Sequence, residues 1–218
     1  MTHALINEFV VHADAYIDLH GGDIPEALVP FVICRSEAEL TESKARDVAA
    51  RAKQMAMAFG LPYVLTVSKP VQPSKGQSSY AAAAEKGTPA ILAEAGGVGQ
   101  MQEEAVALLA NGVMSVMRHL GMIAGEHPHL DPLPNKVEEG TATMLTKFDW
   151  LYAKHAGMWY PGFAPGDAVK EGEQIGTVTD LFGDTLENID SPVNGVVLFL
   201  TINPSVLENG LLMGIGAE

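Results

Sequence analysis

The chain has 218 residues, 47% of them hydrophobic, and a mean hydropathy of +0.13, so it has enough apolar side chains for one large domain or two small ones. Its formal net charge of −14 repels phosphate backbones, which argues against nucleic acid as a partner. No apolar stretch is long enough to span a bilayer and no export leader is visible, so we expect a cytoplasmic protein with no membrane partner. The single Cys34 excludes an internal disulfide and a cysteine-based metal site.

The first two thirds of the chain alternate between short apolar runs and helical patterns, which indicates a sheet with crossover helices. Residues 68–79 are polar and rich in turn formers, so we expect a surface loop there. In chain order the expected elements are the end of a helix over 2–11, a strand over 15–20, an apolar run over 30–34, a helix over 43–59 capped by Gly60, a strand over 62–67, a short helix over 80–86, an apolar strand that ends at Glu94, and a helix over 102–120.

The strand over 15–20 leads directly into His20 and two glycines. Side chains alternate along a strand, so Asp18 and His20 share one face. A carboxylate two residues before a histidine can accept its ring N–H, which fixes the tautomer and leaves the second nitrogen for a metal or a proton. The pattern therefore indicates half of an active site. The alternative is an ordinary histidine at a strand end.

A second apolar run, over 88–97, ends in Glu94 and two glycines. In an open α/β sheet the carboxyl ends of parallel strands meet at one edge, where sites assemble. We therefore expect His20 and Glu94 to converge. A glutamate at that edge can take a proton from the water that a zinc hydrolase activates. The alternative is an acid that favours a helix N-terminus or lies on the surface.

From Thr141 onward the pattern changes to short strands and turns, after a linker-like stretch over 125–140. His127 and His129 in this linker each adjoin a proline, so we do not expect one rigid element to present both to a metal ion. The change of pattern predicts two domains, an α/β domain over 1–137 and a small β domain over 138–218.

Two phrases in the C-terminal half resemble those of biotinyl and lipoyl carrier domains, which have a barrel-sandwich fold. They are G-D-x-V-x-x-G over 166–172 and S-P-x-x-G-x-V over 191–197. The carriers present a modified lysine on a hairpin between the two phrases, whereas residues 181–186 here read L-F-G-D-T-L. The absence of a lysine excludes a swinging cofactor arm and leaves a structural or gating role.

Three phrases in this order resemble the succinylglutamate desuccinylase/aspartoacylase family of zinc-dependent deacylases: D-L-H-G-G-D over 18–23, A-E-A-G-G over 93–97 with a Glu-Glu helix after it, and the carrier-like tail. The stretch over 21–31 is similar to the branch that includes N-acetyl-diaminobutyrate deacetylases. The resemblance implies an α/β fold, with a zinc-carboxypeptidase-like parallel or mixed sheet followed by a β barrel-sandwich domain.

The resemblance also implies hydrolysis of the amide of a small N-acyl amino acid, with Zn²⁺ as the cofactor. His20 would be a metal ligand, and Glu94 would be the general base that then protonates the leaving amine. Asp18 is our own addition to this site, as the residue that orients His20.

One departure from the family is plain in the sequence. The family takes its other two zinc ligands from an H-x-x-E motif, and none of the seven histidines here has a glutamate three residues later; the arginines that bind the substrate carboxylate are missing as well. We therefore interpret the chain as an N-terminally truncated member, whose complete site needs a complementing N-terminal segment or a homo-oligomer. The competing hypotheses are a non-catalytic binding or assembly module derived from that fold, and a carrier or adaptor built around the tail.

Overall fold

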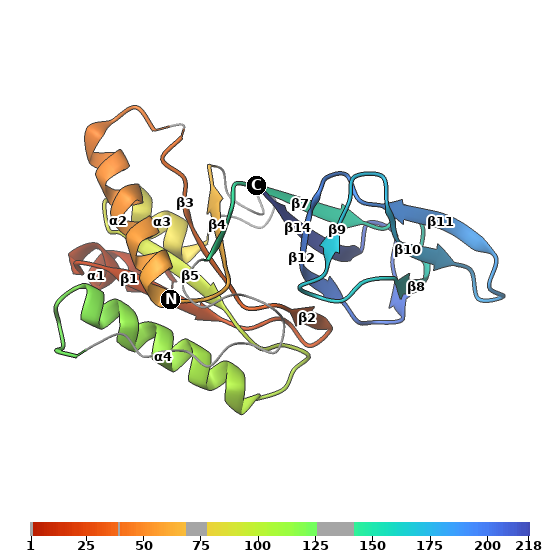
Figure 1. Cartoon of the computed structure of the whole chain (residues 1–218), viewed down its shortest axis with the longest axis horizontal. Coiled ribbons are helices and arrows are strands. Elements are labelled where there is room, and N and C mark those ends of the chain that lie inside the picture. Colours follow the sequence, from red (N-terminus) through yellow and green to blue (C-terminus); the bar gives the residue numbers. More distant parts are fainter. Residues whose placement is uncertain (1, 39, 69–77, 126–141) are drawn as a thin grey trace. The chain divides into compact units, whose positions relative to one another are not determined.

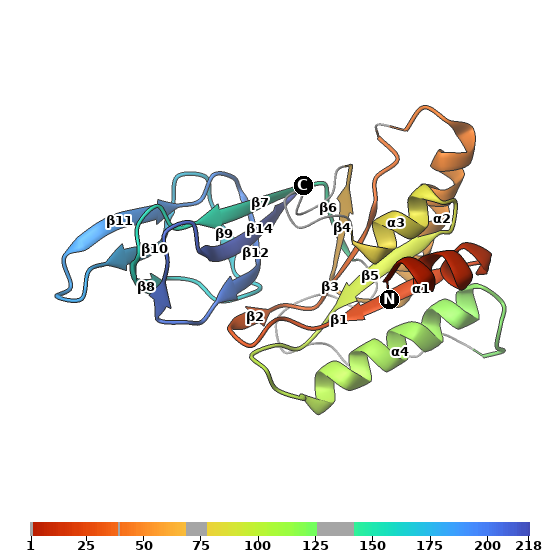
Figure 2. The same ribbon diagram turned by 180° about the vertical axis from the view of Figure 1, so that it is seen from behind.

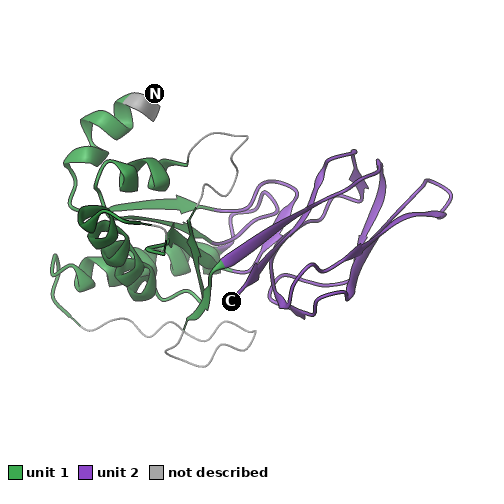
Figure 3. Ribbon diagram, turned by 90° about the horizontal axis from the view of Figure 1, so that it is seen from above, with its two compact units in different colours: residues 1–20, 30–94, 103–146 green, residues 21–29, 95–102, 147–218 purple. Residues whose placement is uncertain are grey.

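The computed structural model describes residues 2–38, 40–68, 78–125 and 142–218, and it divides into two compact units (Figure 3). Unit 1 comprises residues 1–20, 30–94 and 103–146, and unit 2 comprises residues 21–29, 95–102 and 147–218. The units are therefore not contiguous in sequence, because two short segments from the first half of the chain belong to unit 2. The expected boundary between residues 137 and 138, and the linker histidines His127 and His129, lie outside the described residues.

Unit 1 is built on one five-stranded sheet (Figure 1). Its elements are α1 (Thr2–Glu8), the 3-10 helix η1 (Val10–His12), β1 (Tyr16–His20), β3 (Phe31–Arg35), α2 (Ser43–Phe59), β4 (Tyr63–Val67), α3 (Ser79–Glu85), β5 (Ala90–Glu94), α4 (Glu103–His119) and β6 (Thr143–Leu145). The strand order is β1-β5-β3-β4-β6, and neighbouring strands are parallel except for β3 and β5. The expected α/β class with a mixed sheet is confirmed, and none of the described helices is long and apolar enough to cross a membrane.

Helix α2 supplies much of the core of unit 1. Ala52, Met55 and Phe59 follow one another at helical spacing, are almost fully buried and belong to the same apolar cluster as Val64 of β4. Gly60 ends the helix in the left-handed conformation, with φ of 86°, which glycine adopts without a steric penalty. Helix α2 packs against α4, and α1 packs against α3, as Figures 1 and 2 show from opposite sides.

Gly112 of α4 lets the ring of Phe59 approach the helix backbone, because a Cβ at this position would clash with three ring carbons. We expect Gly112→Ala to lower the free energy of unfolding by about 1–3 kcal/mol, since overpacking a rigid core outweighs the roughly 1 kcal/mol that alanine adds to helix propensity. Denaturant titration measures the change. Asn111→Ala, on the exposed side of the same helix, is the matched control and should leave stability equal or slightly raised; equal behaviour of the two variants would contradict the packing argument.

Cys34 of β3 is fully buried, and its burial raises the pKa of the thiol to about 12. Because the thiolate is the reactive form, we expect the native thiol to react with a disulfide reagent at pH 8 roughly a thousandfold more slowly than an unperturbed cysteine. Absorbance from the released thiol measures the rate, and denaturant should restore the ordinary value. Fast labelling of the folded chain would contradict this burial.

Unit 2 consists of two antiparallel sheets. Its elements are β2 (Glu26–Leu28), β7 (Lys147–Tyr152), β8 (Gly157–Pro161), β9 (Ala168–Val169), β10 (Gln174–Thr179), β11 (Thr185–Asp190), β12 (Gly195–Thr201), β13 (Ser205–Val206) and β14 (Leu211–Ala217). One sheet has the order β11-β10-β8-β13 and the other β2-β12-β14-β7, with β9 paired to β12. Strand β2 was not expected from the sequence; it comes from the first half of the chain and pairs with β12.

The two carrier-like phrases lie side by side in unit 2. Ala168 of the first phrase pairs with Val196 of the second, and Val169 pairs with Gly195. Val169 also belongs to the apolar core of this unit, together with residues such as Trp159, Ile175 and Ile215. The phrases therefore specify how strands of the β domain meet, which gives them a structural role without a lysine.

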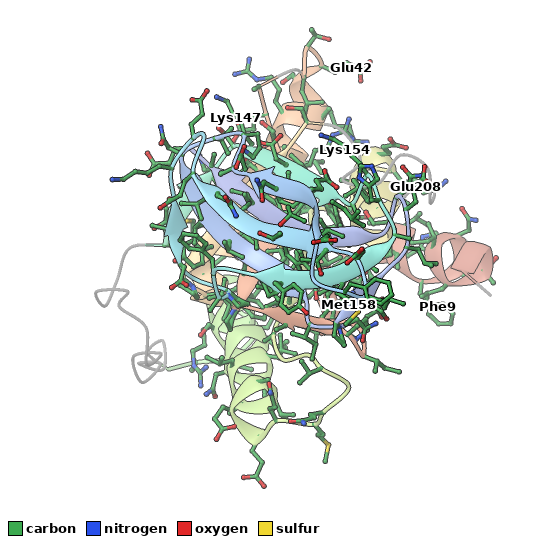
Figure 4. All side chains as sticks on the ribbon, turned by 90° about the vertical axis from the view of Figure 1, so that its right-hand side faces the viewer. Phe9, Glu42, Lys147, Lys154, Met158 and Glu208 are labelled. Atoms are coloured by element: carbon green, nitrogen blue, oxygen red, sulfur yellow. The ribbon has the colours of Figure 1, made fainter. Side chains whose placement is uncertain are left out.

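The hairpin between the phrases, from β10 to β11, is held by Asp180. Its Oδ1 accepts the backbone N–H groups of Phe182 at 2.8 Å and of Asp184 at 2.9 Å. Within β11, the carboxylate of Glu187 accepts the backbone N–H of Lys154 at 2.8 Å, and Nζ of Lys154 (labelled in Figure 4) lies 3.6 Å from its Oε1. These contacts give the hairpin a defined shape, with the Phe182 side chain exposed at its tip.

Candidate active site

The predicted site residues lie at the carboxyl ends of two neighbouring parallel strands. Strand β1 pairs with β5 so that His20 stands directly opposite Glu94, the last residue of each strand. Both strands are short apolar runs that stop at a polar residue followed by glycines, so the same local pattern sets both ends. The structure therefore brings His20 and Glu94 together, as expected from the sequence, while their chemical roles stay predictions.

The His20 ring lies between two carboxylates. Its Nε2 is 3.2 Å from Asp18 Oδ1, and its Nδ1 is 3.7 Å from Glu94 Oε1. The His20 side chain is 47% exposed, whereas those of Asp18 and Glu94 are 18% and 17% exposed. The hydrogen bond to Asp18, together with the charges of Glu94 and Asp18, raises the pKa of His20 despite its partial burial. The imidazole is thus accessible, and carboxylates approach it on both nitrogens.

Asp18 is held by a second contact that the sequence does not indicate. Ser79 Oγ, from the first residue of α3, donates a hydrogen bond to Asp18 Oδ2. Burial alone would raise the pKa of Asp18, but the hydrogen bonds from His20 and Ser79 outweigh it, so the pKa lies below its ordinary value. Asp18 is therefore ionised and accepts two hydrogen bonds, one from His20 and one from Ser79. This is consistent with the orienting role predicted for it.

The sequence pattern predicts a loop over 68–79, which includes Ser79. Residues 69–77 of that loop lie outside the described residues, and the helix begins at Ser79, one residue earlier than expected. The only sequence signal was the pair Ser78 and Ser79 just before an alanine-rich run, which marks a helix N-terminus but does not indicate a partner.

The donor atoms fit part of a zinc site. The His20 side chain is half-exposed, and its Nδ1 lies 3.7 Å from Oε1 of Glu94; imidazole nitrogens and carboxylate oxygens are atom types that zinc binds. Catalytic zinc sites normally have three protein ligands. Within residues 2–38, 40–68, 78–125 and 142–218 no group of three or more His, Cys, Asp or Glu side chains is placed to hold a metal ion. The described residues thus supply one candidate metal ligand, His20, and not a complete set.

Comparison with known proteins gives consistent matches. The family model described as succinylglutamate desuccinylase/aspartoacylase catalytic domain matches residues 1–120, which is more than half of the chain. A curated relative is the N-alpha-acetyl-L-2,4-diaminobutyric acid deacetylase of Halomonas elongata, 24% identical over 170 residues, which cover 78% of this chain and 45% of the relative.

Solved structures with the same fold cover nearly the whole chain. The product-bound structure of the ectoine utilization protein EutE (DoeB) from Ruegeria pomeroyi matches with a TM-score of 0.81 at 21% identity. The match covers 99% of this chain and 62% of the EutE chain. A succinylglutamate desuccinylase/aspartoacylase from Rhodobacter sphaeroides has a TM-score of 0.75 at 20% identity, with coverages of 99% and 62%. The chain therefore spans less than two thirds of the length of each of these relatives.

Proposed function

Because the chain belongs to the succinylglutamate desuccinylase/aspartoacylase family, we propose that it is a zinc-dependent amidohydrolase acting on a small N-acyl amino acid. The observation that supports this proposal most is the juxtaposition of His20 and Glu94 at the ends of β1 and β5, with Nδ1 and Oε1 3.7 Å apart. The similarity to an N-alpha-acetyl-L-2,4-diaminobutyric acid deacetylase makes an acetylated diamino acid the first substrate to test.

In this proposal each residue at the site has a distinct task. When bound, a zinc ion supplies Lewis acidity, which polarises the amide carbonyl and eases deprotonation of the attacking water. His20 would contribute the Nδ1 lone pair as one ligand, because its Nε2 is directed at Asp18. Glu94 accepts the proton of the attacking water and then delivers it to the leaving amine nitrogen, so that the products are a carboxylate and a free amine.

In this proposal the remaining ligands of such a zinc site come from residues outside the described ranges or from a second copy of the chain, both of which are present in the purified protein. The described part of the chain then provides His20, its orienting acid Asp18 and the base Glu94.

A direct assay tests the proposal. The purified chain is incubated with zinc and with N-alpha-acetyl-L-2,4-diaminobutyric acid, N-succinylglutamate or an N-acylated aspartate, and the released amine is measured. We expect release from at least one substrate, loss of release with a chelator, and recovery when zinc is restored. No release from any substrate, together with no zinc uptake, would overturn the proposal.

A second candidate function is a non-catalytic binding or assembly module. The observation that favours it is the lack of a three-ligand group among the described residues. This candidate predicts that native mass spectrometry of the chain in excess zinc detects no bound metal. It also predicts that His20→Ala changes only the local structure around residue 20. Stoichiometric zinc that depends on His20 would exclude it.

A further inference from the structure

Ser79 is the first residue of α3 and has a fixed place beside β1. The helix packs against both β1 and β5. The next residue, Tyr80, is only 2% exposed, and Ala83 one turn later is fully buried, so this short helix is anchored through its apolar side. Ser79 itself is half-buried and donates its hydroxyl hydrogen to Asp18 Oδ2. The hydroxyl is therefore presented to Asp18 by an anchored element.

The two oxygens of Asp18 have different partners. Oδ2 accepts from Ser79, and Oδ1 faces His20 Nε2 at 3.2 Å. An ionised carboxylate only accepts hydrogen bonds, so both partners must donate. Rotation of the carboxylate about its Cβ–Cγ bond would weaken both contacts together. Ser79 thus holds the carboxylate plane in the orientation that accepts a hydrogen bond from Nε2–H.

The orientation of the Asp18 carboxylate matters because Glu94 lies near the other nitrogen of the His20 ring. A neutral imidazole carries one proton, and His20 has a carboxylate near each nitrogen, Asp18 at 3.2 Å and Glu94 at 3.7 Å. If the proton were on Nδ1, it would point toward Glu94, and Nδ1 could not offer a lone pair to a metal ion. With the proton on Nε2, the Nδ1 lone pair is available and the ring donates no hydrogen bond to Glu94.

We propose that Ser79 is a positioning residue, which fixes the Asp18 carboxylate and thereby selects the tautomer of His20 that carries its proton on Nε2. The proposal deepens the proposed function, because the selected tautomer matters for a ligand that uses Nδ1. We expect loss of the Ser79 hydroxyl to weaken zinc binding. Removal of the residues that orient metal-binding histidines lowers metal affinity by about 10- to 100-fold.

The test uses nitrogen-15 NMR of the imidazole groups in the metal-free full chain, at a pH where His20 is neutral. His20→Gln identifies the His20 signals. We expect the wild type to show protonated Nε2 and unprotonated Nδ1. Ser79→Ala should give a mixture of tautomers, whereas Ser79→Thr, which keeps the hydroxyl, should preserve the wild-type pattern. Ser78→Ala is the matched control, one residue away, and should also preserve it.

Zinc titration calorimetry is the second measurement. We expect about 10-fold weaker zinc binding for Ser79→Ala and nearly unchanged binding for Ser79→Thr and Ser78→Ala. A Ser79→Ala chain that is folded by circular dichroism and keeps the wild-type tautomer would overturn the proposal, and so would a wild type with the proton on Nδ1. A wild type that binds no zinc and releases no amine would instead overturn the proposed function, and the tautomer comparison would still decide the role of Ser79.

Discussion

We expect Glu94→Gln to lower kcat for hydrolysis of the N-acyl amino acid by about 10²- to 10⁴-fold, with little change in KM. Glutamine keeps the size of the side chain and its place opposite His20 at the end of β5, but it cannot accept a proton from water at neutral pH. A loss confined to kcat is the result expected when a group acts on the transition state and not on substrate binding. Steady-state kinetics of the zinc-loaded chain measure both constants.

The matched control for this change is Glu104→Gln. Glu104 is exposed in the first turn of α4, so the control removes one carboxylate of the same type outside the site. We expect its kcat to equal that of the wild type. If Glu94→Gln kept more than about a tenth of the wild-type kcat, Glu94 would not be the general base. Circular dichroism on both variants separates this result from a loss of folding.

The convergence of His20 and Glu94 was predictable because local patterns encode it. Each strand is a short apolar run that ends at a polar residue, and alternation along β1 places Asp18 on the same face as His20. What local patterns do not encode is the order of strands. Strand β5 lies between β1 and β3 and is antiparallel to β3, and this depends on packing between residues that are far apart in the sequence.

The composition of unit 2 was beyond local patterns for the same reason. Strand β2 is three residues long and follows a stretch with two glycines and a proline, which indicates turns. It is a strand because Leu28 and Ala27 pair with Phe199 and Leu200 of β12. A segment this short has no periodicity of its own, so only its distant partner defines it.

Within the site, Ser79 shows most clearly what local sequence patterns do not predict. The serine is 61 residues from Asp18 in the sequence, and a serine at the start of a helix has a common local explanation as a capping residue. The prediction of Asp18 as the partner of His20 needed only the two-residue spacing on one strand. The contact that holds Asp18 itself required the three-dimensional placement of α3 against β1.

We expect His20→Ala to weaken zinc binding by more than about 100-fold and to abolish the zinc-dependent activity, because it removes a ligand and not merely a residue that orients one. Asp18→Asn should weaken zinc binding less, by about 10- to 100-fold. The imidazole ring remains, but the negative charge 3.2 Å from its Nε2 is removed. Calorimetry and metal analysis of the purified variants measure this order.

His119→Ala is the control for the histidine change, because His119 is exposed in the last turn of α4 and is not one of the site residues. Its zinc affinity should equal that of the wild type. The graded order matters more than any single value: an adventitious metal bound by exposed histidines would be weakened equally by His119→Ala and His20→Ala, and it would not respond to Asp18→Asn. Only a metal ligated through Nδ1 of an oriented His20 responds to the ligand most, to its orienting acid less, and to the distant histidine not at all.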